Sequence, residues 1–307
     1  MEGPAALIGI DWGTTSFRAW RIDESGNVLE ARAVAAGILK VPGGAFEAAL
    51  EREIGDWLGA RPSAVIASGM ITSRQGWLEV PYCPCPAGRA EIAAGLVRHR
   101  TGKGCEIHFV PGLSLLGEDG VPDVMRGEET QILGELGEER EPRLMVLPGT
   151  HSKWALAEDG RIVRFATFMT GEVYSVLKEH SILGRLMHDD TPDETAFLRG
   201  AAYARSGRGG LLGKLFSART LGLFEQLPGE AIGSYLSGLL IGAEIAAAVQ
   251  CIPAPDAAAE ITVIGESAFA ERYRIALDAA GLPARRAADQ ASARGHVVIA
   301  RAAGLLP

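Results

Sequence analysis

Residues 6–34 read ALIGIDWGTTSFRAWRIDESGNVLEARAV, and residues 144–168 repeat the same order of parts as LMVLPGTHSKWALAEDGRIVRFATF. Each copy opens with an apolar strand, continues through a loop with the pattern G-T-x-S, and ends with two strands joined by a glycine-containing turn. Short apolar runs bounded by such turns are typical of β-strands. The shared order argues against two unrelated hairpins, so two related β-rich halves are expected.

The two G-T-x-S loops are candidate phosphate-binding loops. A Gly-Thr turn between two strands brings backbone N–H groups and hydroxyls to one concave spot, which suits an anion and phosphate above all. The first loop contains Gly13, Thr14 and Thr15 and follows Asp11, whose carboxylate suits the shell of a Mg²⁺ ion. The second loop has no carboxylate at the matching place. Two lobes that grip one polyphosphate are therefore expected.

Composition and charge narrow the class of protein. The 307 residues are 47% hydrophobic and 22% charged, which allows two lobes with a substantial core. The net charge is −8 and no basic stripe is present, so nucleic acid is not an expected partner. The four cysteines, Cys83, Cys85, Cys105 and Cys251, lack a zinc spacing and are expected to be free thiols.

No membrane partner is expected either. The first strand begins within six residues of the N-terminus, which leaves no room for a signal peptide. The most apolar long stretch, residues 236–249, contains Glu244 and is too short to span a bilayer. The protein is therefore expected to be cytoplasmic, and the sequence leaves open whether it forms a homo-oligomer.

The order of elements after the first three strands predicts an α/β lobe. Apolar residues at helical spacing predict a helix over residues 46–58, and residues 64–67 form a short buried strand that ends at Ser68 and Gly69. Because ligands bind beyond the carboxyl ends of strands in open α/β sheets, Asp11 and residues 68–70 should lie on the same rim.

Residues 70–89, MITSRQGWLEVPYCPCPAGR, form a candidate acceptor loop. They show no clear period, and loops of this length inside a compact domain are usually functional. Arg74, Gln75 and Trp77 suit a small carboxylated, hydroxylated ligand, since the planar fork of Arg bonds both carboxylate oxygens. The alternative is a surface excursion with a buried Trp77.

A second group of candidate residues begins an amphipathic helix that continues through Leu136. Glu128 and Glu129 stand at its start, where acidic side chains complement the helix dipole. They also lie just before the second copy, where the lobes should meet, so one carboxylate is a candidate general base. The charged segment 138–142 ends in Pro and marks the lobe boundary, giving lobes of residues 1–141 and 142–307, with the last helix free to pack back on the first.

These motifs resemble those of the actin, hexokinase and Hsp70 ATPase superfamily. Its phosphate loops match residues 11–15 and 148–153, and its adenosine turn matches residues 263–267. The chain is similar in particular to the 2-dehydro-3-deoxygalactonokinase family. That likeness rests on the stretches DWGTTSFRAW, SGMITSRQGWLEVPY, VMRGEETQILG, LPGTHSKW, FMTGEVYSVLKEHSIL and SYLSGLLIGAEI.

The resemblance implies a fold and an activity. The fold would be α/β, with two ribonuclease-H-like lobes, each a mixed five-stranded sheet flanked by helices, and the active site in the cleft between them. The activity would be that of a phosphotransferase with an alcohol acceptor. ATP and Mg²⁺ would serve as cofactors, and the 6-hydroxyl of a small sugar acid, 2-dehydro-3-deoxy-D-galactonate, would be phosphorylated.

The resemblance also assigns residues by position. Asp11 would organise Mg²⁺ through water. The nucleotide-binding set would be Gly13, Thr14, Thr15, Gly149, Thr150, His151, Ser152, Lys153 and Gly265. From the loop 70–89 and the start of the following helix, the residues expected to line the acceptor site are Met70, Arg74, Gln75, Trp77, Arg126 and Glu128.

The catalytic base is the least determined role. Many sugar kinases of the superfamily carry an acidic base at the second phosphate loop, where this chain has Leu and Pro. Residues 126–129 resemble an acidic segment of exopolyphosphatases, which favours Glu129 over Glu128, and Asp123 and His151 are the alternatives. Two other functions remain open, a phosphohydrolase of the exopolyphosphatase type and a kinase for a related keto-deoxy sugar acid.

Overall fold

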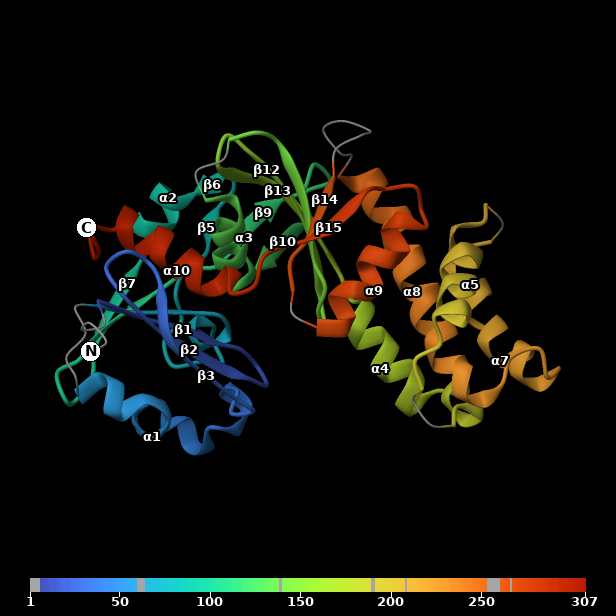
Figure 1. Cartoon of the computed structure of the whole chain (residues 1–307), viewed down its shortest axis with the longest axis horizontal. Coiled ribbons are helices and arrows are strands. Elements are labelled where there is room, and N and C mark those ends of the chain that lie inside the picture. The colour runs from blue at the N-terminus through green and yellow to red at the C-terminus, as the bar shows by residue number, and fades with distance from the viewer. Residues whose placement is uncertain are drawn as a thin grey trace. The chain divides into compact units, whose positions relative to one another are not determined.

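The computed structural model describes residues 6–59, 64–137, 140–188, 191–207, 209–252, 260–265 and 267–307. The chain divides by its contacts into two compact units. Unit 1 comprises Met1–Pro142, Ala157–Arg164 and Ala288–Pro307, and unit 2 comprises Arg143–Leu156 and Phe165–Ala287. Strands and helices in both units give a mixed α/β fold (Figure 1).

Unit 1 is built on a mixed sheet with the strand order β3-β2-β1-β4-β8-β7. Its strands are β1 (Leu7–Trp12), β2 (Phe17–Ile22), β3 (Val28–Val34), β4 (Ala64–Ser68), β7 (Val97–Arg100) and β8 (Glu106–Phe109). The first three are antiparallel neighbours, and β4 pairs with β1 in parallel, so Asp11 and Ser68 lie on the same rim, as predicted.

The prediction of five strands for this sheet was wrong, since the described residues form six. The sixth, β7, pairs antiparallel with β8. Its sequence, VRHR, is charged at three of four positions if His is counted, so it lacks the apolar run by which strands are recognised.

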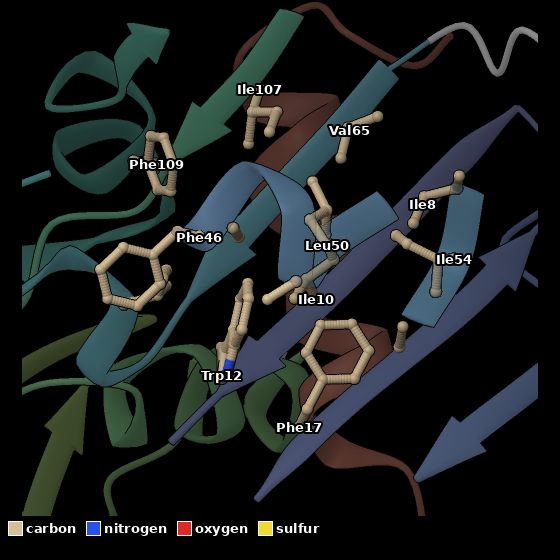
Figure 2. Packing of buried hydrophobic residues seen from close by; sticks show 14 of the residues in the cluster. Ile8, Ile10, Trp12, Phe17, Phe46, Leu50, Ile54, Val65, Ile107 and Phe109 are labelled. Atoms are coloured by element: carbon tan, nitrogen blue, oxygen red, sulfur yellow. The ribbon is translucent and has the colours of Figure 1, made fainter. Parts of the chain in front are cut away.

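One face of the unit 1 sheet packs on α1 (Phe46–Gly59). Side chains alternate along β1, so Ile8, Ile10 and Trp12 point to this face and enter a core shared with Phe46 and Leu50 (Figure 2). The intervening residues of β1, Asp11 among them, point to the opposite face.

That opposite face packs on α10 (Ala291–Ala302), which contacts β1, β4 and α3 (Glu128–Leu136). The apolar residues of segment 297–305 predict a helix there, whereas the observed helix begins at Ala291 and ends at Ala302, so the sequence pattern misses its first turns. The missed part is polar and small, ASARGH, and carries no apolar period.

Shorter elements complete unit 1. They are η1 (Ile38–Lys40), η2 (Pro42–Gly44), η3 (Met70–Thr72), β5 (Cys83–Pro84), β6 (Ala87–Gly88), α2 (Arg89–Ala94), β9 (Leu113–Leu116) and β10 (Pro122–Met125). In the described chain β10, β9 and β5 form a three-stranded sheet. The predicted acceptor loop 70–89 therefore contains a helical turn and two short strands.

The second large sheet has the order β15-β14-β11-β12-β13-β6. Its further strands are β11 (Arg143–Leu147), β12 (Ser152–Glu158), β13 (Arg161–Phe168), β14 (Ile261–Val263) and β15 (Ala284–Arg286). Here too the described residues form six strands and not the predicted five. The two-residue β6 pairs with the start of β13, across 73 or more positions of sequence that no local pattern spans.

Unit 2 adds helices to this sheet: α4 (Thr170–His180), η4 (Gly184–Leu186), α5 (Glu194–Arg205), α6 (Leu211–Leu215), α7 (Ser217–Leu223), α8 (Gly229–Cys251) and α9 (Ser267–Asp278). Helix α5 packs along α8 (Figure 1). The expectation that the apolar stretch is too short to span a membrane was wrong, because α8 has 23 residues. However, 78% of its apolar window is buried inside the protein, which identifies α8 as a core helix.

Candidate functional site

The first G-T-x-S loop is a tight turn that another segment of the chain supports through a backbone hydrogen bond. The N–H of Gly13 donates to the carbonyl of Ser16 at 2.9 Å. The N–H of Gly37 donates to the carbonyl of Thr15 at 3.1 Å, so a second turn of the chain supports the loop. Thr14 and Thr15 are exposed. Their side chains are thus displayed on a fixed backbone, as an anion-binding loop requires.

Asp11 lies half-buried near the end of β1. The hydroxyl of Ser292 in α10 donates to Asp11 Oδ2 at 3.3 Å. Ser68 is the register partner of Asp11 on β4, and a Cβ on the next residue, Gly69, would lie 3.0 Å from Asp11 Oδ1. The carboxylate is therefore oriented by the last helix and by the end of β4.

The turn that begins α3 touches the turn that follows β4. Gly69 has φ 91° and Gly127 has φ 108°, both in the left-handed region that favours glycine. A Cβ on Gly127 would lie 3.1 Å from the Cα of Gly69. The start of α3, with its two glutamates, is therefore held against the same end of β4 that contacts Asp11.

The two glutamates differ in environment. Glu129 is 1% exposed; its Oε2 accepts the N–H of Gly127 at 2.6 Å and its Oε1 accepts the Thr130 hydroxyl at 3.0 Å. Burial, with the charge of Glu128 second, raises the pKa of Glu129 to about 7. Glu128 is half-buried and accepts the N–H of Arg126 at 2.9 Å. Glu129 thus has the pKa of a group that exchanges a proton near neutrality.

Arg126 lies where its guanidinium braces the acceptor loop. Nη1 donates to the carbonyl and hydroxyl of Thr72 at 2.6 and 2.7 Å, and Nη2 donates to the carbonyl of Val80 at 2.9 Å. The guanidinium also stacks over the ring of Tyr82, 4.2 Å from its centroid. These contacts engage both terminal nitrogens and leave Nε buried without a partner, so the geometry favours a loop-holding role over the substrate-binding role expected from the sequence.

The acceptor loop has an inner and an outer side. Trp77 stacks on Phe46 with ring centroids 6.3 Å apart, and both Trp77 and Met70 pack against the core of unit 1. Arg74 and Gln75 are exposed. Of the residues predicted to bind the acceptor, this polar pair is therefore accessible to a ligand from the outer side of the loop.

The second G-T-x-S loop, between β11 and β12, is closed by the first turn of α4. The N–H of Glu172 donates to the carbonyl of Thr150 at 3.0 Å, and the Glu172 carboxylate lies 2.5 Å from His151 Nε2. A Cβ on Gly171 would lie 2.4 Å from the carbonyl oxygen of Gly149, so only glycine allows this close approach. Thr150 and His151 are exposed.

The last two residues expected in this phosphate loop point inward. Ser152 is fully buried, with its Oγ 2.8 Å from the hydroxyl of Tyr273. Lys153 is 6% exposed, and its Nζ donates to the Thr167 hydroxyl at 2.6 Å. The predicted set thus divides into a part at the surface, residues 149–151, of which Gly149 is half-buried, and a buried part.

A pocket of about 360 Å³ opens beside this loop, within unit 2. It is lined by Gly149, Thr150, Thr170, Gly171, Tyr174, Ser175, Ser237, Leu240, Ile241, Phe269 and Arg272. Gly265, the predicted adenine contact, follows β14 and stands before α9, the helix that contributes Phe269 and Arg272; Glu266 of that turn lies outside the described residues. The sequence marked the α4 and α8 segments but could not identify which of their residues face a pocket.

The other candidate base, Asp123, lies partly buried in β10, where its Oδ1 accepts the N–H of Val124 at 2.7 Å. The described residues contain no group of three or more His, Cys, Asp or Glu side chains placed to hold a metal ion. Asp11 is suited to Mg²⁺ without such a group, because Mg²⁺ usually keeps several waters and binds one or two carboxylates plus substrate phosphates. The cysteines of the described chain are free.

The chain is similar to a defined set of proteins along nearly all of its length. A sequence model of the 2-keto-3-deoxy-galactonokinase family matches residues 11–299. A Rhizobium meliloti protein described as a probable 2-dehydro-3-deoxygalactonokinase is 36% identical over 300 residues, 95% of this chain and 96% of that protein. The 2-dehydro-3-deoxygalactonokinase of Escherichia coli is 35% identical over 277 residues, 90% of this chain and 91% of that one.

Solved structures extend the comparison to the fold. A Sinorhizobium meliloti crystal structure, of a candidate 2-dehydro-3-deoxygalactonokinase, superposes with a TM-score of 0.87 at 34% identity and covers 96% of this chain and 98% of its own. The activator of 2-hydroxyisocaproyl-CoA dehydratase from Clostridium difficile, solved with bound ADPNP, has a TM-score of 0.51 at 12% identity and covers 96% and 92%. At that identity the likeness concerns the fold, the mixed α/β fold of actin-like ATPases.

Proposed function

Because the chain belongs to the 2-keto-3-deoxy-galactonokinase family of ATP-using kinases, we propose that it transfers the γ-phosphoryl group of ATP to the 6-hydroxyl of 2-dehydro-3-deoxy-D-galactonate. The observation that carries this proposal is the family match over residues 11–299, which includes both G-T-x-S loops. The new bond joins O6 to the γ-phosphorus, the bond from that phosphorus to the β,γ-bridging oxygen breaks, and ADP leaves. We expect the reaction in the cytoplasm, where ATP is available.

Unit 2 supplies the nucleotide site in this proposal. Leu240, Ile241 and Phe269 give the pocket an apolar surface for a base, while the loop at Gly149 and Thr150 offers polar groups to phosphate. The N-terminus of α4 lies against this loop and carries the partial positive charge of the helix dipole, which favours an anion.

Unit 1 supplies the metal ligand and the first phosphate loop. Asp11 would hold Mg²⁺, directly or through water, and Ser292 fixes the orientation of its carboxylate. Mg²⁺, when bound, neutralises charge on the phosphates of the nucleotide. Thr14 and Thr15 are placed on a braced turn to contact the terminal phosphates.

The acceptor is bound by the outer side of the loop that Arg126 holds. Arg74 suits the carboxylate of a sugar acid, and Gln75 suits its hydroxyls. We assign the base to Glu129, because α3 begins against the end of β4 that contacts Asp11 and because a carboxylate with a pKa of about 7 accepts a proton near neutrality. Glu129 is 1% exposed, so its carboxylate reaches the 6-hydroxyl only if the start of α3 shifts when the acceptor binds. Phosphoryl transfer depends mainly on positioning and charge neutralisation, and the remaining residues serve those purposes.

A coupled assay of ADP release over a panel of acceptors tests this function. We expect ATP turnover with 2-dehydro-3-deoxy-D-galactonate, slower turnover with the gluconate-derived epimer, and a negligible rate without sugar. Faster turnover with the epimer would assign the chain to a related keto-deoxy sugar acid. Equal turnover with and without sugar would contradict a kinase and support a phosphohydrolase of the exopolyphosphatase type.

A further inference from the structure

Beneath the unit 2 pocket lies a buried carboxylate that has no part in the reaction described above. Glu244 stands in the apolar helix α8 and is 3% exposed. A carboxylate in such a place is costly unless hydrogen bonds compensate for the lost water. The partners of Glu244 therefore indicate why this helix retains an acidic residue.

Those partners come from three other elements of unit 2. Trp154 Nε1–H, from β12, donates to Glu244 Oε1 at 2.8 Å, and the hydroxyl of Tyr273, from α9, donates to Oε2 at 2.7 Å. Hydrogen bonds with Thr170, the first residue of α4, and with Ser152, the first residue of β12, lower the pKa of Glu244, but burial outweighs them and the pKa is raised. One carboxylate thus joins β12, α4, α8 and α9.

The same four segments form the nucleotide pocket. Gly149 and Thr150 lie in the loop before β12, separated from the strand by one residue, and Gly171 immediately follows Thr170 on α4. Ile241 lies three residues before Glu244 on α8, and Phe269 lies four residues before Tyr273 on α9. Residues three or four apart lie on the same face of a helix. The hydrogen bond between Glu244 and Tyr273 therefore fixes the turns of α8 and α9 from which Ile241 and Phe269 line the pocket.

We propose that Glu244 is a positioning residue that sets the shape of the nucleotide pocket, acting on the second phosphate loop through Tyr273 and Ser152. This inference rests on the proposed function only in that the pocket takes a nucleotide. Burial and the neighbouring Glu244 raise the pKa of Tyr273 well above its ordinary value, so its hydroxyl stays a donor. The hydroxyl of Ser152 is consequently directed inward, and phosphate is left to the part of the loop at the surface, residues 149–151.

A carboxylate suits this position because its partners are donors. An ionised carboxylate accepts at both oxygens, whereas the amide of Gln replaces one acceptor with an NH₂ donor. In Glu244→Gln that NH₂ would face either the indole N–H of Trp154 or the hydroxyl of Tyr273. The substitution preserves size and shape, so it tests the hydrogen bonding and leaves the packing volume unchanged.

The test compares Glu244→Gln and Tyr273→Phe with a matched control, Tyr235→Phe. Tyr235 is also a buried tyrosine of unit 2 whose hydroxyl bonds a serine, Ser217 at 2.9 Å, but it does not line the pocket. The readouts are the Kd of ADP by titration calorimetry, the KM for ATP and for the sugar acid, and circular dichroism as a check of folding. We expect ADP to bind roughly tenfold or more weakly to Glu244→Gln and severalfold more weakly to Tyr273→Phe, since each loses a hydrogen bond to a charged group.

The KM for the sugar acid should stay within about twofold in both variants, and Tyr235→Phe should bind ADP as the wild type does. Wild-type ADP affinity in folded Glu244→Gln and Tyr273→Phe would overturn the inference, as would an equal loss in Tyr235→Phe. If Glu244→Gln does not fold, Tyr273→Phe decides by the same criteria. The expected pattern of ADP affinities in a protein that phosphorylates no sugar acid would support the inference while refuting the proposed kinase function.

Discussion

Glu129 is an acidic side chain buried where its charged form is disfavoured. Its pKa is raised from 4.5 to about 7 by burial, so the folded protein holds this proton more tightly than the unfolded chain does. This tighter binding of the proton contributes to the free energy of unfolding. The contribution is fully present below about pH 4.5 and is lost as the pH rises through about 7. A shift of this size corresponds to roughly 3 kcal/mol.

The first prediction concerns the pH dependence of stability in Glu129→Gln. The amide does not ionise, so the free energy of unfolding of the variant relative to the wild type should rise by about 3 kcal/mol between pH 4.5 and pH 8. Urea unfolding at a series of pH values measures this difference. The same variant should lose about 10²–10⁴-fold in kcat. Parallel stability curves for the two proteins would show that the carboxyl is not perturbed.

The second prediction concerns the acceptor carboxylate. Arg74→Ala should raise the KM for the sugar acid roughly tenfold or more and leave the KM for ATP unchanged, because a charge-assisted hydrogen bond to the acceptor is lost. Arg52→Ala is the matched control, since Arg52 is an exposed arginine on α1. Equal changes in the two KM values for Arg74→Ala would count against the assignment.

The third prediction concerns Asp11. Asp11→Asn should lower turnover strongly while circular dichroism stays that of the wild type, because the amide is a poor Mg²⁺ ligand. Ser292→Ala, which removes one hydrogen bond to Asp11, should have a milder effect, seen as a higher Mg²⁺ requirement. Normal turnover in Asp11→Asn at ordinary Mg²⁺ concentration would remove this residue from the site.

At the scale of elements, local pattern identified the long elements and missed the short ones. The helix over residues 46–58 and the apolar strand that opens the second copy at residue 144 were predicted nearly at their observed bounds, because their apolar patterns are complete. The strands β5, β6, β9 and β10 have two to four residues, too few for a period to be recognised. The missed first turn of α10 carries Ser292, so the contact with Asp11 could not be predicted from local sequence.

The fourth prediction concerns the segment that Arg126 holds. Arg126→Lys keeps the charge but loses the planar fork whose two nitrogens bond Thr72 and Val80 separately, so the loop between them should loosen. Amide hydrogen exchange over residues 70–82 should become faster, and the KM for the sugar acid should rise. If the variant exchanged its amide hydrogens in this segment at the wild-type rate but had a raised KM for the sugar acid, Arg126 would instead bind the substrate itself.

At the scale of the whole molecule, the repeated G-T-x-S unit predicted more than any single residue did. It predicted two phosphate-binding loops, and the longer stretches around these loops predicted a kinase, which the family match confirms. The division of the chain into units does not follow sequence order, because residues 157–164 and 288–307 are grouped with the N-terminal part of the chain. Contacts such as that between Asp11 and Ser292, 281 positions apart, depend on tertiary packing and leave no mark in a sequence window.

The most direct test of the proposed function determines which atom receives the γ-phosphoryl group of ATP. The protein would be incubated with ATP, Mg²⁺ and 2-dehydro-3-deoxy-D-galactonate labelled with ¹³C at C6, and the products would be observed by ³¹P and ¹³C NMR. We expect one phosphate monoester per ADP formed, with coupling between phosphorus and C6. Stoichiometric inorganic phosphate beside an unmodified sugar acid, or a phosphate at another hydroxyl, would contradict it.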